Sequence, residues 1–402
     1  MFQTLTERPL PTIYTTDARF EADGRPDKLL LSTGLYCDAE GRCPVPEFIK
    51  EAEARVLASE QTKAYLLWGG DGAFNAALEA FVLGAEHPAR VSGKTRTLQT
   101  PGSTAALRLV AELMARHAPG KACWVSQPGW GNHTQICLDV GVPVKTYPYL
   151  RADGLAVDLD AVVGALEGAN AGDAVVFQAA NHLPTGVDPS AEQWAVLADL
   201  CARRGLVPVL DAAFLGFGAP FEQEFAGLRA FFDVVQGGGF VTTSFGKAFG
   251  LYRERVGALT IVGPCAQRAQ ALWTHALHAV RTIYSSPPSH GAAVARTVLA
   301  DPDLRAGLES RTAQIRARLG LMRRLIAERA QAAGLGARFA RIQHERGLFT
   351  KTGMDEGQVA ALHDRFAIHM NSRAVLNVSA LPQASVERFI DAMAHVVADS
   401  EG

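Results

Sequence analysis

Short apolar runs recur through the middle of the chain, and segments of helical period lie between several of them. The runs carry few charged residues, which is typical of parallel strands buried on both faces. They lie at residues 122–126, 143–147, 174–178, 206–210, 240–244 and 256–262. Between two of them, Trp194, Leu197 and Leu200 recur at helical spacing within residues 190–204. This alternation predicts an α/β fold with a mostly parallel sheet between helices.

The last third of the chain has a different pattern. Residues 304–333 are rich in Arg, Ala and Leu, with apolar positions three and four residues apart, which predicts one long amphipathic helix. A mixed stretch follows, with a strand near 347–350 and helices near 356–366 and 385–398. We therefore expect a large domain over residues 45–305. A smaller α+β domain would combine residues 1–44 with residues 306–402.

Composition and charge exclude several classes of protein. With 48% hydrophobic and 20% charged residues, the chain of 402 residues is neither disordered nor fibrous. Its 39 basic and 41 acidic residues give no electrostatic reason to expect nucleic acid or a membrane surface as partner. Six cysteines without CxxC spacing indicate reduced thiols. The sequence shows neither a signal peptide nor an apolar run of about 18 residues, so we expect a cytoplasmic protein.

Residues 242–263 are the most informative segment for function. Lys247 follows a predicted strand, with Ser244 three residues before it and Arg255 eight residues after it. A lysine in apolar surroundings can have a lowered pKa and act as an amine nucleophile, while a hydroxyl and a guanidinium suit a phosphate. Together they indicate pyridoxal phosphate, an aldehyde cofactor with a phosphate group. Taken singly, the three residues would also fit a solvated basic loop.

The sequence SFGKAFGLYRERVGAL, at residues 244–259, resembles the lysine signature of the class I aminotransferases, in their aspartate and aromatic branch. The resemblance covers nearly the whole chain. It includes TLQTPGSTAALRL (97–109), PGWGNH (128–133), LPTGVDP (183–189), VPVLDAAFLGFG (207–218), VRTIYSSPPSHGA (280–292) and LSTGLYCDAEGRCPVP (31–46). It implies the aspartate aminotransferase-like fold of pyridoxal-phosphate-dependent transferases, and aminotransferase activity.

The resemblance also implies the roles of several site residues. Lys247 would attach the cofactor and later move a proton between the substrate's Cα and the cofactor. Asp211 would pair with the pyridine nitrogen, because a nearby carboxylate favours its protonated form. Trp130 would stack on the ring, and His133 would form a hydrogen bond with Asp211.

The phosphate would be held by Ser103, Thr104, Ser244 and Arg255, at the positive N-terminus of a helix that opens near Ala105.

Further positions correspond to residues that contact the substrate or a second subunit. Tyr65 matches the position from which the family's neighbouring subunit reaches the phosphate, and Arg281 matches the second-subunit arginine that meets a dicarboxylic substrate. The resemblance also places Gly34 and Phe349 among the substrate contacts. A homodimer with shared active sites follows from these assignments.

Three site positions depart from the family. Leu183 replaces the asparagine, and Phe214 the tyrosine, that bond the cofactor's phenolic oxygen. Val375 replaces the arginine that binds the substrate's α-carboxylate, and Arg373 lies two residues upstream. Gln178 also stands where the family often has a histidine.

These departures leave several functions open. The first hypothesis is an aminotransferase with altered carboxylate recognition, acting on a peptide N-terminus or another substrate without a free α-carboxylate. The second is an aminotransferase of free aspartate or aromatic amino acids that uses Arg373. Others are a lyase or racemase with the same cofactor and a non-catalytic regulatory protein.

No metal site is expected, since His275 and His278 share a helical spacing without a third ligand.

Overall fold

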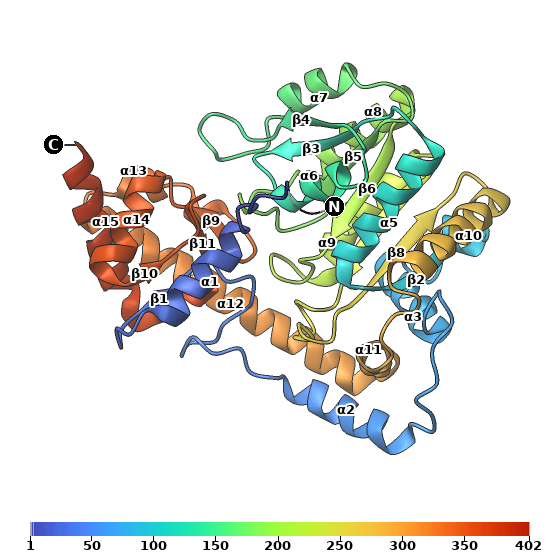
Figure 1. The fold of residues 1–402 in the computed structure, drawn as a ribbon, viewed down its shortest axis with the longest axis horizontal. Helices are drawn as coiled ribbons and strands as arrows, with labels where there is room; N and C mark the ends of the chain where they lie inside the picture. The colour runs from blue at the N-terminus through green and yellow to red at the C-terminus, as the bar shows by residue number, and fades with distance from the viewer. Residues whose placement is uncertain (1, 3, 402) are drawn as a thin grey trace. The chain divides into compact units, whose positions relative to one another are not determined.

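The computed structural model describes residues 2 and 4–401, and the chain divides into two compact units (Figure 1). The smaller unit combines Met1–Pro44 with Arg318–Gly402, and the larger unit is Val45–Ala317. The division falls between Ala317 and Arg318, whereas the sequence interpretation placed it after residue 305. Both positions lie in the long helix α12 (Pro302–Ala332). No helix within residues 4–401 combines the length and the apolar character that crossing a membrane requires.

The larger unit contains a seven-stranded sheet in the order β2-β8-β7-β6-β5-β3-β4. Its strands are β2 (Thr95–Pro101), β3 (Cys123–Gln127), β4 (Val144–Pro148), β5 (Ala174–Gln178), β6 (Val207–Ala212), β7 (Gly239–Ser244) and β8 (Val256–Val262). Strands β4, β3, β5, β6 and β7 run parallel, whereas β8 runs antiparallel to both β7 and β2. The predicted α/β fold with a mostly parallel sheet is therefore confirmed.

Strand β2 has no counterpart among the predicted strands. Its sequence, TRTLQTP, is too polar to be recognised as a buried strand. The polar groups are nevertheless buried because they find partners inside the protein. For example, the hydroxyl groups of Thr97 and Thr260 lie 2.9 Å apart across the β2–β8 pair.

Helices pack on both faces of this sheet, and alternate residues of β5 show the two faces. Val176 belongs to a core that includes residues of α5, α6 and α10. The next residue, Phe177, instead contacts Trp194 of α8 and Phe231 of α9. This alternation is the two-residue period of a strand buried on both sides. The helices of this unit are α2 (Glu47–Ser59), α3 (Gly72–Leu83), α4 (Pro88–Val91), α5 (Gly102–His117), α6 (Gly131–Leu138), α7 (Leu159–Glu167), α8 (Ala191–Arg204), α9 (Phe221–Val234), α10 (Ala266–Ile283) and α11 (His290–Ala300).

The smaller unit is built from the two ends of the chain. Its elements outside α12 are α1 (Thr12–Ala22), β1 (Leu29–Leu30), α13 (Gly336–Phe339), β9 (Phe349–Lys351), α14 (Glu356–Phe366), β10 (Ile368–His369), β11 (Val375–Asn377) and α15 (Val386–Glu401). Three short 3-10 helices lie at Ile342–His344, Val378–Ala380 and Gln383–Ser385. Strand β1 pairs in parallel with β10, and this ladder joins the N-terminal segment to the C-terminal one. Strands β9 and β11 pair antiparallel within the C-terminal segment.

Candidate active site

The candidate site of the larger unit lies where the parallel strands β5, β6 and β7 end. Asp211 in β6 is in register with Gln178 at the end of β5 and with Thr242 in β7. Ser244 ends β7, and Lys247 follows three residues later. Carboxyl ends of parallel strands meet at one edge of a sheet, which is where open α/β sheets usually bind ligands.

Asp211 is a buried carboxylate held by two neighbours. It is 5% exposed, and its Oδ2 lies 2.8 Å from Nε2 of His133, which is also buried. The hydroxyl of Thr242 donates to the other carboxylate oxygen at 3.3 Å. The two contacts fix the orientation of the Asp211 carboxylate at the edge of the sheet.

Lys247 is half-buried between two aromatic rings. Its Nζ lies 4.9 Å from the ring centre of Phe214 and 5.4 Å from that of Tyr252. Aromatic faces attract an ammonium group at these distances, so both rings help to hold the lysine side chain. The sequence argument missed Tyr252, although it lies only five residues after the lysine in the most informative segment.

The order of the strands brings the expected phosphate residues to the same edge. Because β8 is antiparallel to both neighbours, its first residues lie beside the last residues of β7 and β2. Arg255 directly precedes β8, and Ser244 ends β7. Helix α5 begins with Gly102, Ser103 and Thr104 directly after β2. Its first N–H groups have no acceptor within the helix, and its positive end favours an anion.

Gly102 allows the guanidinium of Arg255 to approach the start of α5. The residue has a φ of +78°, and a Cβ atom there would lie 2.6 Å from Nη2 of Arg255. Within the described part of the chain, Arg255 forms no ion pair with a carboxylate. A cationic side chain, a helix N-terminus and the hydroxyl groups of three residues therefore come from adjacent strand ends and the start of α5.

This arrangement fits pyridoxal phosphate. The start of α5 and the Arg255 guanidinium near Gly102 suit a phosphate, and the buried Asp211 suits a protonated ring nitrogen. Lys247 supplies an amine that can react with an aldehyde. Trp130 precedes α6, and its ring meets that of His133 edge-on, with ring centres 5.0 Å apart. The stacking of Trp130 on a cofactor stays a prediction.

The two loops that carry the departures Leu183 and Phe214 are held by buried polar side chains. Gln178 donates to the carbonyl of Leu183 at 2.8 Å and accepts from its N–H group at 2.9 Å. The side-chain amide of Asn181 donates to the carbonyl of Phe214 at 2.7 Å and to Glu224 at 2.8 Å.

Glu224, in α9, organises the loop after Phe214. Its carboxylate accepts hydrogen bonds from the backbone N–H groups of Gly216, Gly218 and Ala219, as well as from Asn181. Burial raises the pKa of Glu224, and these N–H groups oppose the rise. No sequence motif marked Glu224 or Asn181, because their role depends on contacts between distant residues.

Tyr65 and Arg281 lie on an exposed surface of the larger unit. Tyr65 is 96% exposed, and nearby Leu67 and Trp68 are also exposed. The guanidinium of Arg281 lies 5.6 Å from the ring centre of Trp68 and donates to Ser285 at 2.6 Å. Among the described residues, no contact joins Tyr65 to the expected phosphate residues of its own chain.

The remaining candidate residues belong to the smaller unit. Val375 is buried in β11, and Phe349 is buried in β9, opposite Asn377. The side chain of Asn377 donates to the carbonyls of Thr33 and Leu35, which flank Gly34.

Arg373 lies two residues upstream of Val375, outside β11. It is exposed on the turn before β11, and Ala374, between the two residues, has a φ of 54°. The backbone N–H of Arg373 donates to Asn371 at 3.1 Å, which fixes this turn. The backbone of Arg373 therefore belongs to this turn, whereas that of Val375 belongs to strand β11.

Comparison with known proteins relates this arrangement to one family. The family model for aminotransferase class I and II matches residues 26–393. Aspartate aminotransferase of Escherichia coli (strain K12) is 38% identical over 325 residues, 81% of this chain and 82% of the relative. Tyrosine aminotransferase of Rhizobium meliloti (strain 1021) is 39% identical over 329 residues, 82% and 83% of the two chains.

Solved structures give the same relationship. The aromatic-amino-acid aminotransferase of Burkholderia pseudomallei, which is covalently bound to pyridoxal phosphate, superposes with a TM-score of 0.93 at 34% identity. The superposition covers 98% of this chain and 99% of the other. The cytoplasmic aspartate aminotransferase of Saccharomyces cerevisiae gives a TM-score of 0.95 at 25% identity, over 99% of both chains.

Proposed function

The chain belongs to the aminotransferase class I and II family, and we propose that its substrate carries an amide rather than a free carboxylate next to the reacting amine. The N-terminal residue of a peptide is such a substrate, and its transamination would leave a 2-oxoacyl terminus. The observation that carries this proposal is Val375, a buried apolar residue. The sequence resemblance pairs it with the family's carboxylate-binding arginine.

Pyridoxal phosphate is the cofactor, as the sequence predicts. When bound, it supplies an electron-accepting ring for the electrons released as the substrate's Cα–H bond breaks. Lys247 would hold it through Nζ and carry the proton that leaves Cα. Asp211, fixed by His133 and Thr242, would keep a positive charge on the ring nitrogen.

The phosphate residues would anchor the cofactor during the reaction. Arg255 supplies a full positive charge, and the first N–H groups of α5 supply donors that point along the helix axis. Ser103, Thr104 and Ser244 add hydroxyl groups at the same edge of the sheet. These contacts would hold the cofactor independently of its attachment to Lys247.

The argument for an amide substrate rests on desolvation. A free carboxylate that leaves water needs a cation or strong donors, and an unpaired one costs several kcal/mol. Val375 has no polar side-chain atom, and its backbone is tied into β11 opposite Lys351. A peptide or amide nitrogen carries no charge, so it avoids this cost.

A second candidate is an aminotransferase of free aspartate or aromatic amino acids. The names of the relatives favour it, since they are aspartate, tyrosine and aromatic-amino-acid aminotransferases. In this case Arg373 would have to supply the missing charge, which requires a shift of the turn that Asn371 holds.

Turnover of phenylalanine, phenylalanine amide and a dipeptide with N-terminal phenylalanine separates the two candidates. We expect a kcat/KM at least tenfold higher for the amide and the dipeptide, and no effect of Arg373→Ala. The matched variant Val375→Arg should shift the preference toward free phenylalanine. Efficient turnover of free aspartate or phenylalanine that Arg373→Ala abolishes would contradict the amide proposal.

We also propose that the enzyme is a homodimer. Trp68 lies beside Arg281, and the segment that carries it also exposes Tyr65, so this apolar and cationic surface suits a second copy of the chain. Sedimentation of the purified protein tests this, and Trp68→Asp should shift it toward the monomer. A wild-type protein that sediments as a monomer would contradict the proposal.

A further inference from the structure

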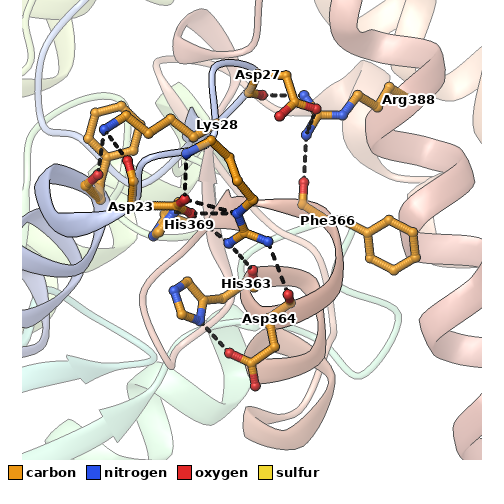
Figure 2. Close-up of polar contacts among 10 residues, drawn as sticks. Asp23, Asp27, Lys28, His363, Asp364, Phe366, His369 and Arg388 are labelled. Atoms are coloured by element: carbon orange, nitrogen blue, oxygen red, sulfur yellow. Dashed lines mark hydrogen bonds and ion pairs between the residues drawn. The ribbon is translucent and has the colours of Figure 1, made fainter.

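Two histidines and an aspartate of the smaller unit form a cluster that the aminotransferase reaction does not use. Asp23 follows α1, His363 lies in the last turn of α14, and His369 ends β10 (Figure 2). One carboxylate oxygen of Asp23 and one ring nitrogen of each histidine all lie within 4.8 Å of one another. Sequence spacing could not reveal this group, because Asp23 and His369 are 346 residues apart.

The core of the cluster is buried and already ordered. Nε2 of His369 lies 2.9 Å from Oδ2 of Asp23, and their side chains are 1% and 7% exposed. The pairing of β1 with β10 holds His369 from its backbone, since Leu31 donates to the carbonyl of His369 at 2.9 Å. The ring of His363 meets that of His369 edge-on, with centres 4.6 Å apart.

His363 is oriented as metal-binding histidines usually are. Its Nδ1 lies 2.6 Å from a carboxylate oxygen of Asp364, so the ring proton belongs on Nδ1 and the lone pair on Nε2 (Figure 2). A carboxylate on the far nitrogen fixes the tautomer of a ligand histidine and raises its basicity. At 29% exposure, the side chain of His363 also gives an ion a path from solvent.

We propose that Asp23, His363 and His369 bind one divalent transition-metal ion of the zinc type. The ligands would be Oδ2 of Asp23 and Nε2 of both histidines, a donor set that suits Zn²⁺, Co²⁺ and Ni²⁺. The ion replaces the proton of the hydrogen bond between Nε2 of His369 and Oδ2 of Asp23. That proton moves to Nδ1 of His369, so the ring stays neutral. Zinc ligands at about 2.0–2.2 Å stand about 3.3–3.5 Å apart in a tetrahedron, so side-chain rotations complete the site.

Arg25 competes with the ion for Asp23. Its Nη2 donates to Oδ2 at 2.6 Å, while its Nε donates at 2.9 Å to Oδ1 and at 3.0 Å to Oδ2. The backbone N–H of Arg25 also donates to Oδ1 at 3.0 Å. When Oδ2 turns to the ion, Oδ1 can keep its hydrogen bonds from Nε and the backbone N–H of Arg25. Nη2 then loses Oδ2 as a partner but keeps the carbonyl of His363, to which it also donates at 2.8 Å.

A bound ion would join the N-terminal segment to the C-terminal part of the smaller unit. Asp23 lies between α1 and β1, whereas both histidines lie in the segment from α14 to β10. Occupancy would therefore stabilise the fold of this unit, since an ion that binds only the folded state raises its stability.

Cobalt serves as the probe because its visible absorption reports coordination by protein ligands. The full chain, loaded with its cofactor, is titrated with Co²⁺, and Zn²⁺ is then added to displace it. We expect one Co²⁺ per chain with a visible band, displaced by Zn²⁺, and a higher melting temperature with either ion. His363→Ala and His369→Ala should each weaken binding at least tenfold, and Asp364→Asn about 10- to 100-fold.

The matched control is His275→Ala. His275 is an exposed histidine whose ring lies 4.3 Å from that of His117, so this pair is an alternative imidazole site. Binding that His275→Ala leaves unchanged supports the proposal. If His369→Ala fails to fold, the more exposed His363→Ala decides. Absence of cobalt binding, or binding that survives His363→Ala, overturns the proposal, and neither result depends on the substrate of the aminotransferase.

Discussion

Replacing Leu183 by Asn and Phe214 by Tyr should lower the pH at which the cofactor–Lys247 linkage loses its proton. The family resemblance pairs these positions with the asparagine and the tyrosine that bond the cofactor's phenolic oxygen, and neither Leu183 nor Phe214 has a side-chain donor. The phenolate is then less stable alone and holds the linkage proton more tightly. The double variant returns both donors and stabilises the deprotonated linkage.

The size of the shift follows from the energy of the missing bonds. A hydrogen bond to a charged group contributes roughly 1.5–3 kcal/mol, and one pKa unit corresponds to about 1.4 kcal/mol. Each restored donor therefore lowers the pKa by about 1 unit or more, and the pair by about 2 units or more. The aromatic contact 4.9 Å from Lys247 remains when Phe214 becomes tyrosine, so the variant adds only the hydroxyl group.

Asn181 does not supply the missing donor in the wild-type protein. Both N–H groups of its side chain are used, by the carbonyl of Phe214 and by Glu224. Its Oδ1 is buried without a hydrogen-bond partner in the described structure, and it can only accept.

The assay is a spectrophotometric pH titration of the cofactor-loaded protein, which requires no substrate. Wild-type protein, both single variants and the double variant are compared, and Leu183→Met serves as a control that adds no donor. We expect the pKa of the linkage to fall in the order wild type, single variants, double variant, with Leu183→Met unchanged. A double variant that titrates at the same pH as wild type, or at a higher pH, would refute the reasoning.

Three further predictions concern the residues that build the site. Gly102→Ala should weaken cofactor affinity at least tenfold, because its Cβ would lie 2.6 Å from the Arg255 guanidinium. Equilibrium dialysis measures the affinity, and an unchanged value would contradict the phosphate site proposed around Gly102. Glu224→Ala should lower the free energy of unfolding by about 3 kcal/mol or more, since it leaves buried N–H groups without an acceptor; denaturant titration measures this, and a loss under about 1 kcal/mol would contradict it. Gln178→Ala should cost about 1–3 kcal/mol in the same titration, because it leaves the N–H and carbonyl groups of Leu183 unpaired; no loss would show that water replaces both bonds.

Local signals in the sequence were sufficient for many of the elements. The helix predicted at residues 356–366 has these bounds in the structure, because a capping box of Asp355 and Gln358 begins it. The buried parallel strands were recognised by their continuous apolar runs. Strand β2 escaped this argument because threonines that bond one another across strands can replace apolar side chains.

Contacts between distant residues could not be predicted from local patterns. Glu224 lies 43 residues from Asn181, and Arg25 lies 338 residues from His363, yet each pair is joined by a hydrogen bond. A hydrophobic period or a short motif carries no information about such pairs. The register of the antiparallel strand β8 similarly determines that Arg255 meets the start of α5, which the sequence suggested only through the family resemblance.

The departures at Leu183 and Phe214 change side chains on loops whose backbone is firmly held. Gln178 binds both backbone groups of Leu183, and Asn181 binds the carbonyl of Phe214. A loop held in this way keeps its position when a polar side chain becomes apolar, so the change acts on the chemistry at that point rather than on the fold. The buried Asp211 and the aromatic contacts of Lys247 remain beside these loops. We therefore expect these departures to change the chemistry around the cofactor rather than to prevent its binding.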